Sequence, residues 1–278
     1  MPRRSWASLL LIFVVLAQSA CGGLLWDAAS GFVVSDSRPG FNLFTHEQDI
    51  ELGKASAEEA AREVRLVADE RVRAYVGRVG ARLAAHAPGY EFPYRFAVVE
   101  APEVNAYAFP GGYVFVNTGA IEAAENEGEL AAVLAHEIAH VALRHGTNQA
   151  SKAYVTRTGL DLVEALTGGG DTELGRLAAH VAGAGAELLF QNYGRSSETE
   201  ADLEGARLMA AAGYDPRDMA RFFSRLGETG AARSTEALSD HPDPRSRVAA
   251  INEAINALPA RPARARDAEE FRLVKRRL

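Results

Sequence analysis

The chain has 278 residues, of which 47% are hydrophobic and 24% charged, and its formal net charge is −7. These fractions are typical of globular proteins and argue against a wholly disordered, collagen-like or polytopic membrane protein. The excess of 37 acidic over 30 basic residues provides no basic surface, so we expect no nucleic-acid partner. The single cysteine excludes an intramolecular disulfide and a thiolate zinc cluster.

The N-terminus has the parts of a secretory signal. Arg3 and Arg4 precede an apolar run at 9–17, which small residues follow, and this order is typical of a signal peptide. The run is too short to cross a hydrocarbon core, which requires about 20 apolar residues. We therefore predict a signal peptide at residues 1–20.

The only cysteine, Cys21, lies where cleavage is expected. This position resembles a bacterial lipoprotein signal, in which the cysteine is lipidated and becomes the new N-terminus. Gly22 and Gly23 do not indicate retention in the inner membrane, so the outer membrane is favoured. An ordinary signal peptide with an incidental cysteine is the alternative.

Residues 21–45 contain glycine, serine and a Pro-Gly pair, which predicts a tether. We expect one compact domain over 46–258. Apolar residues at three-to-four spacing predict a long helical stretch over 46–87. Two β-like runs follow at 94–99 and 106–117, and Pro110-Gly111-Gly112 predicts a turn between antiparallel strands within the second.

The second half of the chain is predicted to be helical. The helical patterns cover 126–144, 148–166, 172–191, 197–212, 216–227 and 242–257. The charged end, 259–278, is expected to be a loosely packed tail. The expected fold class is therefore α+β and mostly helical, with a small antiparallel sheet.

The helix predicted at 126–144 carries an H-E-x-x-H motif, His136-Glu137-Ile138-Ala139-His140. Residues four apart share a helix face, so both imidazoles project together. Neutral imidazole is a good Zn²⁺ ligand, and Glu137 is placed to take a proton from metal-bound water. An apolar stripe lies opposite, and we expect a partly buried helix. His145 is expected to cap the helix end rather than to bind metal.

A catalytic zinc site normally has three protein ligands. The third histidine of the metzincin pattern is absent, because position 146 is Gly146. Glu198 and Asp202 share a helix face, so Glu198 could be the third ligand and Asp202 could hydrogen-bond a ligand histidine. Alternatively, the segment is a solvated first helical turn in which Ser197 and Glu200 form a capping box. Spacing alone leaves both interpretations open.

Four segments together resemble the HtpX and CAAX prenyl endopeptidase family of zinc peptidases, whose periplasmic relatives include BepA-type proteases. They are the sheet element 105–119, the H-E-x-x-H-x-x-x-x-H helix 136–145, the segment 195–216, and His241-Pro242 with Arg247. The matches follow the family order between about 46 and 255. The resemblance implies a zincin-like peptidase domain in which the sheet packs beside the H-E-x-x-H helix. The integral membrane helices of HtpX-like members are missing.

The resemblance also implies roles for individual residues. His136, His140 and Glu198 would bind one Zn²⁺, and Glu137 would act as general base and later as proton donor. Asp202 would hydrogen-bond a ligand histidine without binding the metal itself. His241 and Arg247 would approach the active site, where they would stabilise the oxyanion or block the metal. The strand at 113–116 resembles the edge strand that receives substrate by β-augmentation.

The predicted function is a zinc-dependent metalloendopeptidase. Its expected substrates are polypeptides, namely unfolded or misassembled envelope proteins. The expected location is the periplasmic side of a bacterial cell envelope, where Cys21 would anchor the chain to the membrane. An envelope lipoprotein that binds clients as an assembly factor, with little or no proteolysis, is the alternative. A zinc hydrolase of non-peptide amides is a third possibility.

Overall fold

The computed structural model describes residues 25–27, 32–34, 41–158, 193–228, 244–257 and 268–278. The chain divides into a short N-terminal unit that ends at Ser37 and a main unit that begins at Arg38. In the first unit, β1 (Leu25–Asp27) pairs antiparallel with β2 (Phe32–Val34). Cys21 and the predicted signal peptide lie outside the described residues.

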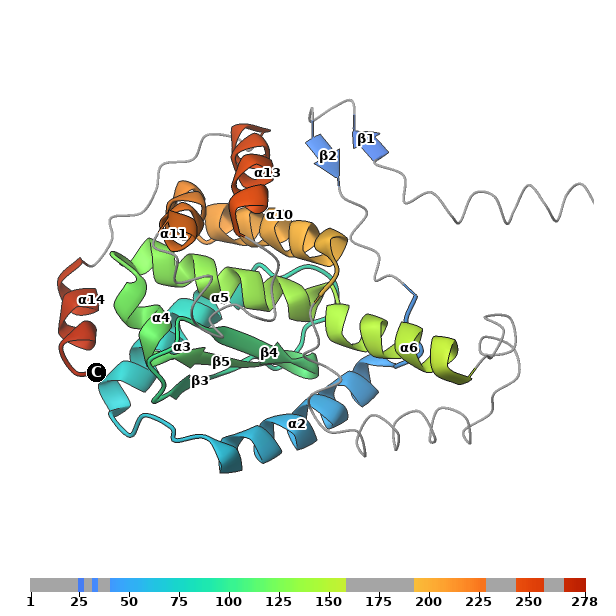
Figure 1. Cartoon of the computed structure of the whole chain (residues 1–278), viewed down its shortest axis with the longest axis horizontal. Helices are drawn as coiled ribbons and strands as arrows, with labels where there is room; N and C mark the ends of the chain where they lie inside the picture. The colour runs from blue at the N-terminus through green and yellow to red at the C-terminus, as the bar shows by residue number, and fades with distance from the viewer. Residues whose placement is uncertain (1–24, 28–31, 35–40, 159–192, 229–243, 258–267) are drawn as a thin grey trace, which may run out of the picture. The chain divides into compact units, whose positions relative to one another are not determined.

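The main unit begins with two helices where one long helical stretch was predicted (Figure 1). They are α2 (His46–Glu63) and α3 (Glu70–Ala84). The break arises because the Asp69 side chain caps a new helix by accepting backbone N–H groups of its first turn. The segment between the helices pairs with the sheet instead, through a bridge between Leu66 and Val99.

The sheet has three strands in the order β3-β5-β4. They are β3 (Arg95–Val99), β4 (Ala106–Phe109) and β5 (Tyr113–Asn117). The 3₁₀ turn η1 (Pro110–Gly112) joins β4 to β5, and these two strands pair antiparallel, as predicted. Because β3 runs parallel to β5, the sheet is mixed rather than wholly antiparallel.

The prediction that residues 113–116 form an edge strand is wrong. Residues 113–116 lie in β5, which pairs on both sides and is the central strand. Val114, Phe115 and Val116 are all buried, so both faces of β5 are covered, as is typical of a central strand. Among the strands that the structure describes in this sheet, β4 is the edge beside the H-E-x-x-H helix.

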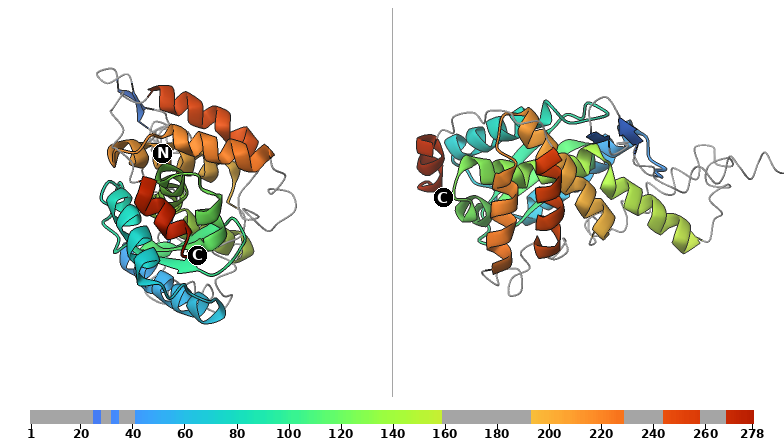
Figure 2. Two further views of the ribbon diagram at one scale, coloured as in Figure 1. Left: turned by 90° about the vertical axis from the view of Figure 1, so that its left-hand side faces the viewer. Right: turned by 90° about the horizontal axis from the view of Figure 1, so that it is seen from above.

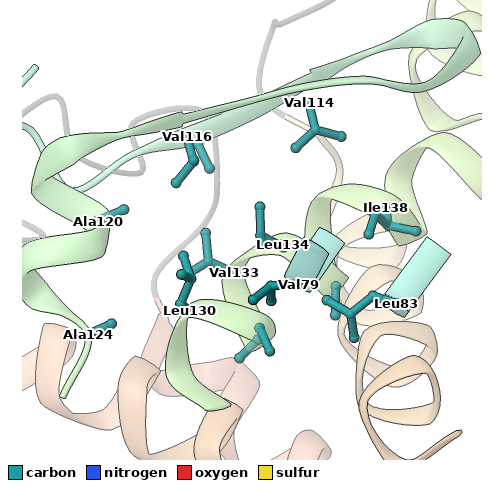
Figure 3. Packing of buried hydrophobic residues seen from close by; sticks show 14 of the residues in the cluster. Val79, Leu83, Val114, Val116, Ala120, Ala124, Leu130, Val133, Leu134 and Ile138 are labelled. Atoms are coloured by element: carbon teal, nitrogen blue, oxygen red, sulfur yellow. The ribbon is translucent and has the colours of Figure 1, made fainter. Parts of the chain in front are cut away.

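The sheet packs between α2 and the H-E-x-x-H helix, α5 (Glu127–Ala142). Phe109 and Phe115 pack with Ala57 of α2 on one face. The other face packs on α3 and α5 through Val79, Leu83, Val114, Val116, Leu130, Leu134 and Ile138 (Figure 3). All residues of α5 are buried, whereas a partly buried helix was expected.

The remaining helices are α4 (Thr118–Ala123), α6 (His145–Thr158), α10 (Arg195–Ala211), α11 (Arg217–Glu228), α13 (Pro244–Ala257) and α14 (Ala268–Lys275). Of these, α4, α6, α10 and α11 pack on α5, whereas α13 packs on α10 and α11, and α14 packs on α3 (Figure 2). Helix α10 begins at Arg195, two residues earlier than expected, so Ser197 is not its N-cap and forms no capping box there. The helix predicted at 172–191 lies outside the described residues.

The end of the chain is packed rather than loose. Phe271 and Val274 of α14 are buried in the main core, and Lys275 Nζ donates hydrogen bonds to the carbonyl oxygens of Glu122 and Ala124. The expectation of a loosely packed tail is therefore wrong for 268–278, because residues one turn apart give α14 an apolar face. None of the helices described here is long and apolar enough to cross a membrane.

Candidate metal centre

The candidate site lies where α5 and α10 run side by side (Figures 1 and 2). The helices approach closely at Gly205, where an added Cβ would lie 3.3 Å from the backbone nitrogen of His136 and 2.9 Å from Cε of Met219. A larger residue would force the neighbouring atoms to shift. This contact brings the carboxylates of α10 opposite the histidines of α5.

His136, His140 and Glu198 form a buried group that could hold a metal ion, with ligand atoms within 4.8 Å of one another. The Nε2 atoms of the two histidines are 3.0 Å apart. Glu198 Oε2 lies 3.6 Å from His136 Nε2, and Glu198 Oε1 lies 3.4 Å from His140 Nε2. Bonds of about 2.1 Å to a tetrahedral ion would separate its ligands by about 3.4 Å. Donor types and spacing therefore both fit a metal ion.

The second nitrogen of His136 faces a different carboxylate. Its Nδ1 lies 3.1 Å from Asp202 Oδ1, whereas its Nε2 faces Glu198. The ring therefore lies between the two carboxylates. Burial lowers the pKa of His136, and the charge of Arg247 lowers it further. Burial likewise holds the pKa of His140 well below its ordinary value, with His136 contributing. Both rings are therefore held neutral, which is the form that binds metal.

Arg247 is buried against both acidic residues of α10. Its Nε donates to Asp202 Oδ2 at 2.7 Å, and its Nη1 lies 2.9 Å from Glu198 Oε2. The guanidinium also lies over the ring of Phe223, 4.6 Å from its centroid. Although burial raises the pKa of Asp202, hydrogen bonds from Arg247 and His136 outweigh it and hold the carboxylate ionised.

Glu137 lies beside the cluster and lines a cleft at the surface of α5. His136, Glu137 and Arg247 form its polar wall, and the rest of the lining is mostly apolar: Val104, Asn105, Ala106, Ala120, Val133, Phe222 and Phe223. The cleft therefore joins the buried carboxylate of Glu137, one candidate metal ligand, His136, and the start of the edge strand β4.

His145 does not cap the end of α5, contrary to expectation. It is buried, and its Nδ1 lies 2.9 Å from Nδ1 of His140. Helix α5 ends at Ala142, and Arg144 takes a left-handed φ of 57° that starts a new helix at His145. Spacing along one continuous helix could not reveal this contact. The one sequence feature that could have indicated a role for His145 at the site is its place as the third histidine of H-E-x-x-H-x-x-x-x-H.

Two of the predicted residues, His241 and Cys21, lie outside the part of the chain that the structure describes. The other six predicted residues converge in one region: His136, Glu137, His140, Glu198, Asp202 and Arg247. Their roles in binding and catalysis stay predictions.

Comparison with known protein families matches residues 70–255 to Peptidase family M48. The chain belongs to peptidase family M48. The match covers most of the described domain and includes both site helices. It confirms the resemblance that the four sequence segments indicated. The structure itself confirms the α+β, mostly helical fold class.

Curated proteins of the same family are similar over most of this chain. The Beta-barrel assembly-enhancing protease of Escherichia coli K12 is 30% identical over 236 residues, covering 83% of this chain and 48% of the relative. The putative enzyme of that name from Vibrio cholerae is 33% identical, covering 78% and 46%. The Mitochondrial metalloendopeptidase OMA1 of Schizosaccharomyces pombe is 31% identical, covering 84% and 69%. The chain thus spans about half the length of the bacterial relatives.

Proposed function

We propose that this chain is a zinc-dependent metalloendopeptidase that hydrolyses peptide bonds of unfolded or misassembled envelope proteins. The observation that carries the proposal is the buried group of His136, His140 and Glu198 with Glu137 beside it in a cleft. Membership of peptidase family M48 supports the same chemistry. Zinc is the proposed ion because two imidazoles and one carboxylate are a common ligand set of catalytic zinc sites.

His136 and His140 would hold the ion through Nε2, and Glu198 would hold it through its carboxylate. When bound, zinc lowers the pKa of a coordinated water toward about 7 and polarises a carbonyl group. Asp202 would keep the His136 ring oriented by accepting from Nδ1, to which it lies 3.1 Å away. The protein thus supplies fixed ligands and a fixed histidine tautomer.

Glu137 would act as the general base. It follows His136 directly on α5 and lines the same cleft, so its carboxylate can accept a proton from the attacking water and later donate it to the leaving amine. The guanidinium of Arg247, which also lines the cleft, would stabilise negative charge that develops on the substrate carbonyl oxygen. His241 is proposed to assist there on the strength of the family resemblance alone.

The substrate would pair with β4 rather than with β5. The backbone nitrogen of Asn117 bonds to the carbonyl of Asn105, and hydrogen-bonded pairs alternate along an antiparallel ladder. The backbone groups of Ala106 and Ala108 therefore point away from β5. An extended peptide added at this edge would pass beside the cleft that contains Glu137.

We further propose that the protein acts on the periplasmic side of a bacterial envelope, anchored to the outer membrane through a lipid on Cys21. The signal-like residues 1–20 support export, and two similar proteins are named for β-barrel assembly. Replacing Cys21 with alanine should release the protein from sedimented membranes into the soluble fraction. Persistent sedimentation of that variant would contradict the anchor.

The proposed activity is tested by measuring zinc content and casein digestion on the purified protein and on Glu137→Gln. We expect one zinc per chain in both, and digestion by the unmutated protein only, with a loss of roughly 10²–10⁴-fold in the variant. Glu122→Gln, an exposed glutamate of α4, is the matched control and should match the unmutated protein. Zinc-free folded protein would refute the metal site, and digestion by Glu137→Gln would refute the base.

A further inference from the structure

His140 has partners on the side that faces away from the proposed metal position. Its Nδ1 lies 2.9 Å from Nδ1 of His145, and the Tyr193 ring stacks on it with centroids 4.2 Å apart. On the far side of His145, Nε2 lies 3.4 Å from Oε2 of Glu200. His140, His145 and Glu200 thus form a chain that leads from the site toward the surface.

The contacts define where the protons lie. If His140 binds metal through Nε2, its neutral ring carries the proton on Nδ1. That proton points at Nδ1 of His145, which must accept it. The proton of His145 is then on Nε2, where it is donated to Glu200. One pair of neutral tautomers therefore satisfies every contact in the chain.

We infer that His145 is a positioning residue, which accepts the Nδ1–H of His140 and so directs Nε2 of His140 at the metal, while Glu200 holds His145 in the accepting tautomer. The inference rests on the proposed function in one respect, namely that His140 binds the ion. It gives the two ligand histidines unlike supports. His136 faces the carboxylate of Asp202, whereas His140 faces a second imidazole.

The position of His145 is held by contacts of its own. The left-handed turn at Arg144 is stabilised by its ion pair with Asp49 and by a hydrogen bond to the carbonyl of Phe44. This turn brings His145 back against α5. Because His140 and His145 are both buried, removing the acceptor would take away a buried hydrogen bond and leave the His140 ring less firmly oriented.

The test compares His145→Asn with His145→Leu in the full chain loaded with one zinc. An asparagine side chain carries an acceptor close to the position of Nδ1, whereas leucine fills a similar volume without one. We measure the rate of zinc transfer to a chelating dye. The leucine variant should release zinc about 10–100-fold faster than the unmutated protein, and the asparagine variant should stay within a few fold of it.

Glu200→Ala is a second variant, useful if His145→Leu does not fold. The Glu200 side chain is 52% exposed, so its loss should not disturb the core, and release should be several-fold faster. Glu253→Ala, an exposed glutamate of α13, is the matched control and should release zinc at the unmutated rate. Nitrogen-15 spectra of the histidine rings supply a direct readout, with His140 protonated on Nδ1 in the zinc-loaded protein.

The outcomes separate this inference from the proposed function. If the unmutated protein holds one zinc and both His145→Leu and Glu200→Ala release it at the unmutated rate, the positioning role is wrong and the peptidase proposal stands. A His140 ring protonated on Nε2 in the zinc-loaded protein would also refute it. If the folded, unmutated protein binds no zinc, both proposals are wrong.

Discussion

Arg247 holds Asp202 against the candidate metal centre, with its Nε 2.7 Å from Asp202 Oδ2. The same guanidinium reaches Glu198, whose Oε2 lies 2.9 Å from Nη1. One cation of α13 thus compensates two buried carboxylates that lie one turn apart on α10. The geometry links the packing of α13 directly to the orientation of the groups that face His136.

Removal of Arg247 should therefore damage stability as well as activity. Arg247→Ala leaves Asp202 and Glu198 buried without their counter-charge, and we expect a loss of about 3–5 kcal/mol in the free energy of unfolding. Arg247→Lys keeps the positive charge but cannot contact both carboxylates at once, so the free energy of unfolding should fall by less. Denaturant unfolding in the presence of a chelator measures both. A chelated Arg247→Ala protein as stable as the parent would contradict this account.

The cleft beside Glu137 should select the residue that flanks the scissile bond. Its lining is mostly apolar, so the parent should prefer peptides with a bulky apolar side chain there. Val133→Phe fills part of the cleft and should lower kcat/KM for such peptides by roughly 10–200-fold, with a smaller effect on alanine peptides. Leu273→Phe, on the exposed side of α14, is the control. Equal losses on all peptides would argue against a specificity pocket.

Two helical glycines should respond oppositely to alanine. A Cβ on Gly53 of α2 would lie 1.7 Å from the carbonyl oxygen of Pro110, which belongs to the backbone of η1. Gly53→Ala should therefore lower the unfolding free energy by about 1–3 kcal/mol or more. Gly77 of α3 has no atom within 4 Å of such a Cβ, and Gly77→Ala should add about 0.5–1 kcal/mol. Thermal unfolding of the pair checks both signs.

The contact between Asp69 and Arg277 should make stability depend on pH under acid conditions. The hydrogen bond from Arg277 lowers the pKa of Asp69 below its ordinary value. A depressed acid pKa stabilises the fold above the unfolded pKa of about 3.9, and that contribution is lost as pH falls through the folded value.

Asp69→Asn keeps a helix-capping side chain at the start of α3 and removes the charge. The variant should melt at a lower temperature than the parent at pH 7, and the difference should shrink near pH 2.5. Calorimetric melting at the two pH values provides the measurement. A difference that stays constant or grows on acidification would show that the ion pair contributes nothing.

Local patterns predicted most of the candidate site. His136 and His140 were expected on one helix face from their spacing, and Glu198 with Asp202 from theirs, because each pair lies within a single helix. The position of His145 could not be predicted in this way. It depends on the backbone turn at Arg144, which distant contacts with the start of α2 stabilise.

The fold was predicted in class, but not in the features that long-range packing decides. The central place of β5 depends on the parallel pairing with β3, and no periodicity within β5 reveals which strand adds to its second edge. The break between α2 and α3 likewise depends on the bridge from Leu66 to Val99. For α14, Phe271 and Val274 gave a short apolar signal that the surrounding charged residues obscured.

The ligands of the proposed ion come from two helices, with His136 and His140 on α5 and Glu198 on α10. An ion bound there would hold these helices together, and it would be released when they separate on unfolding. Binding would then add to stability by mass action, about 2.7 kcal/mol when free metal is 100 times its dissociation constant. The folded fraction of the protein would consequently depend on how much metal its surroundings supply.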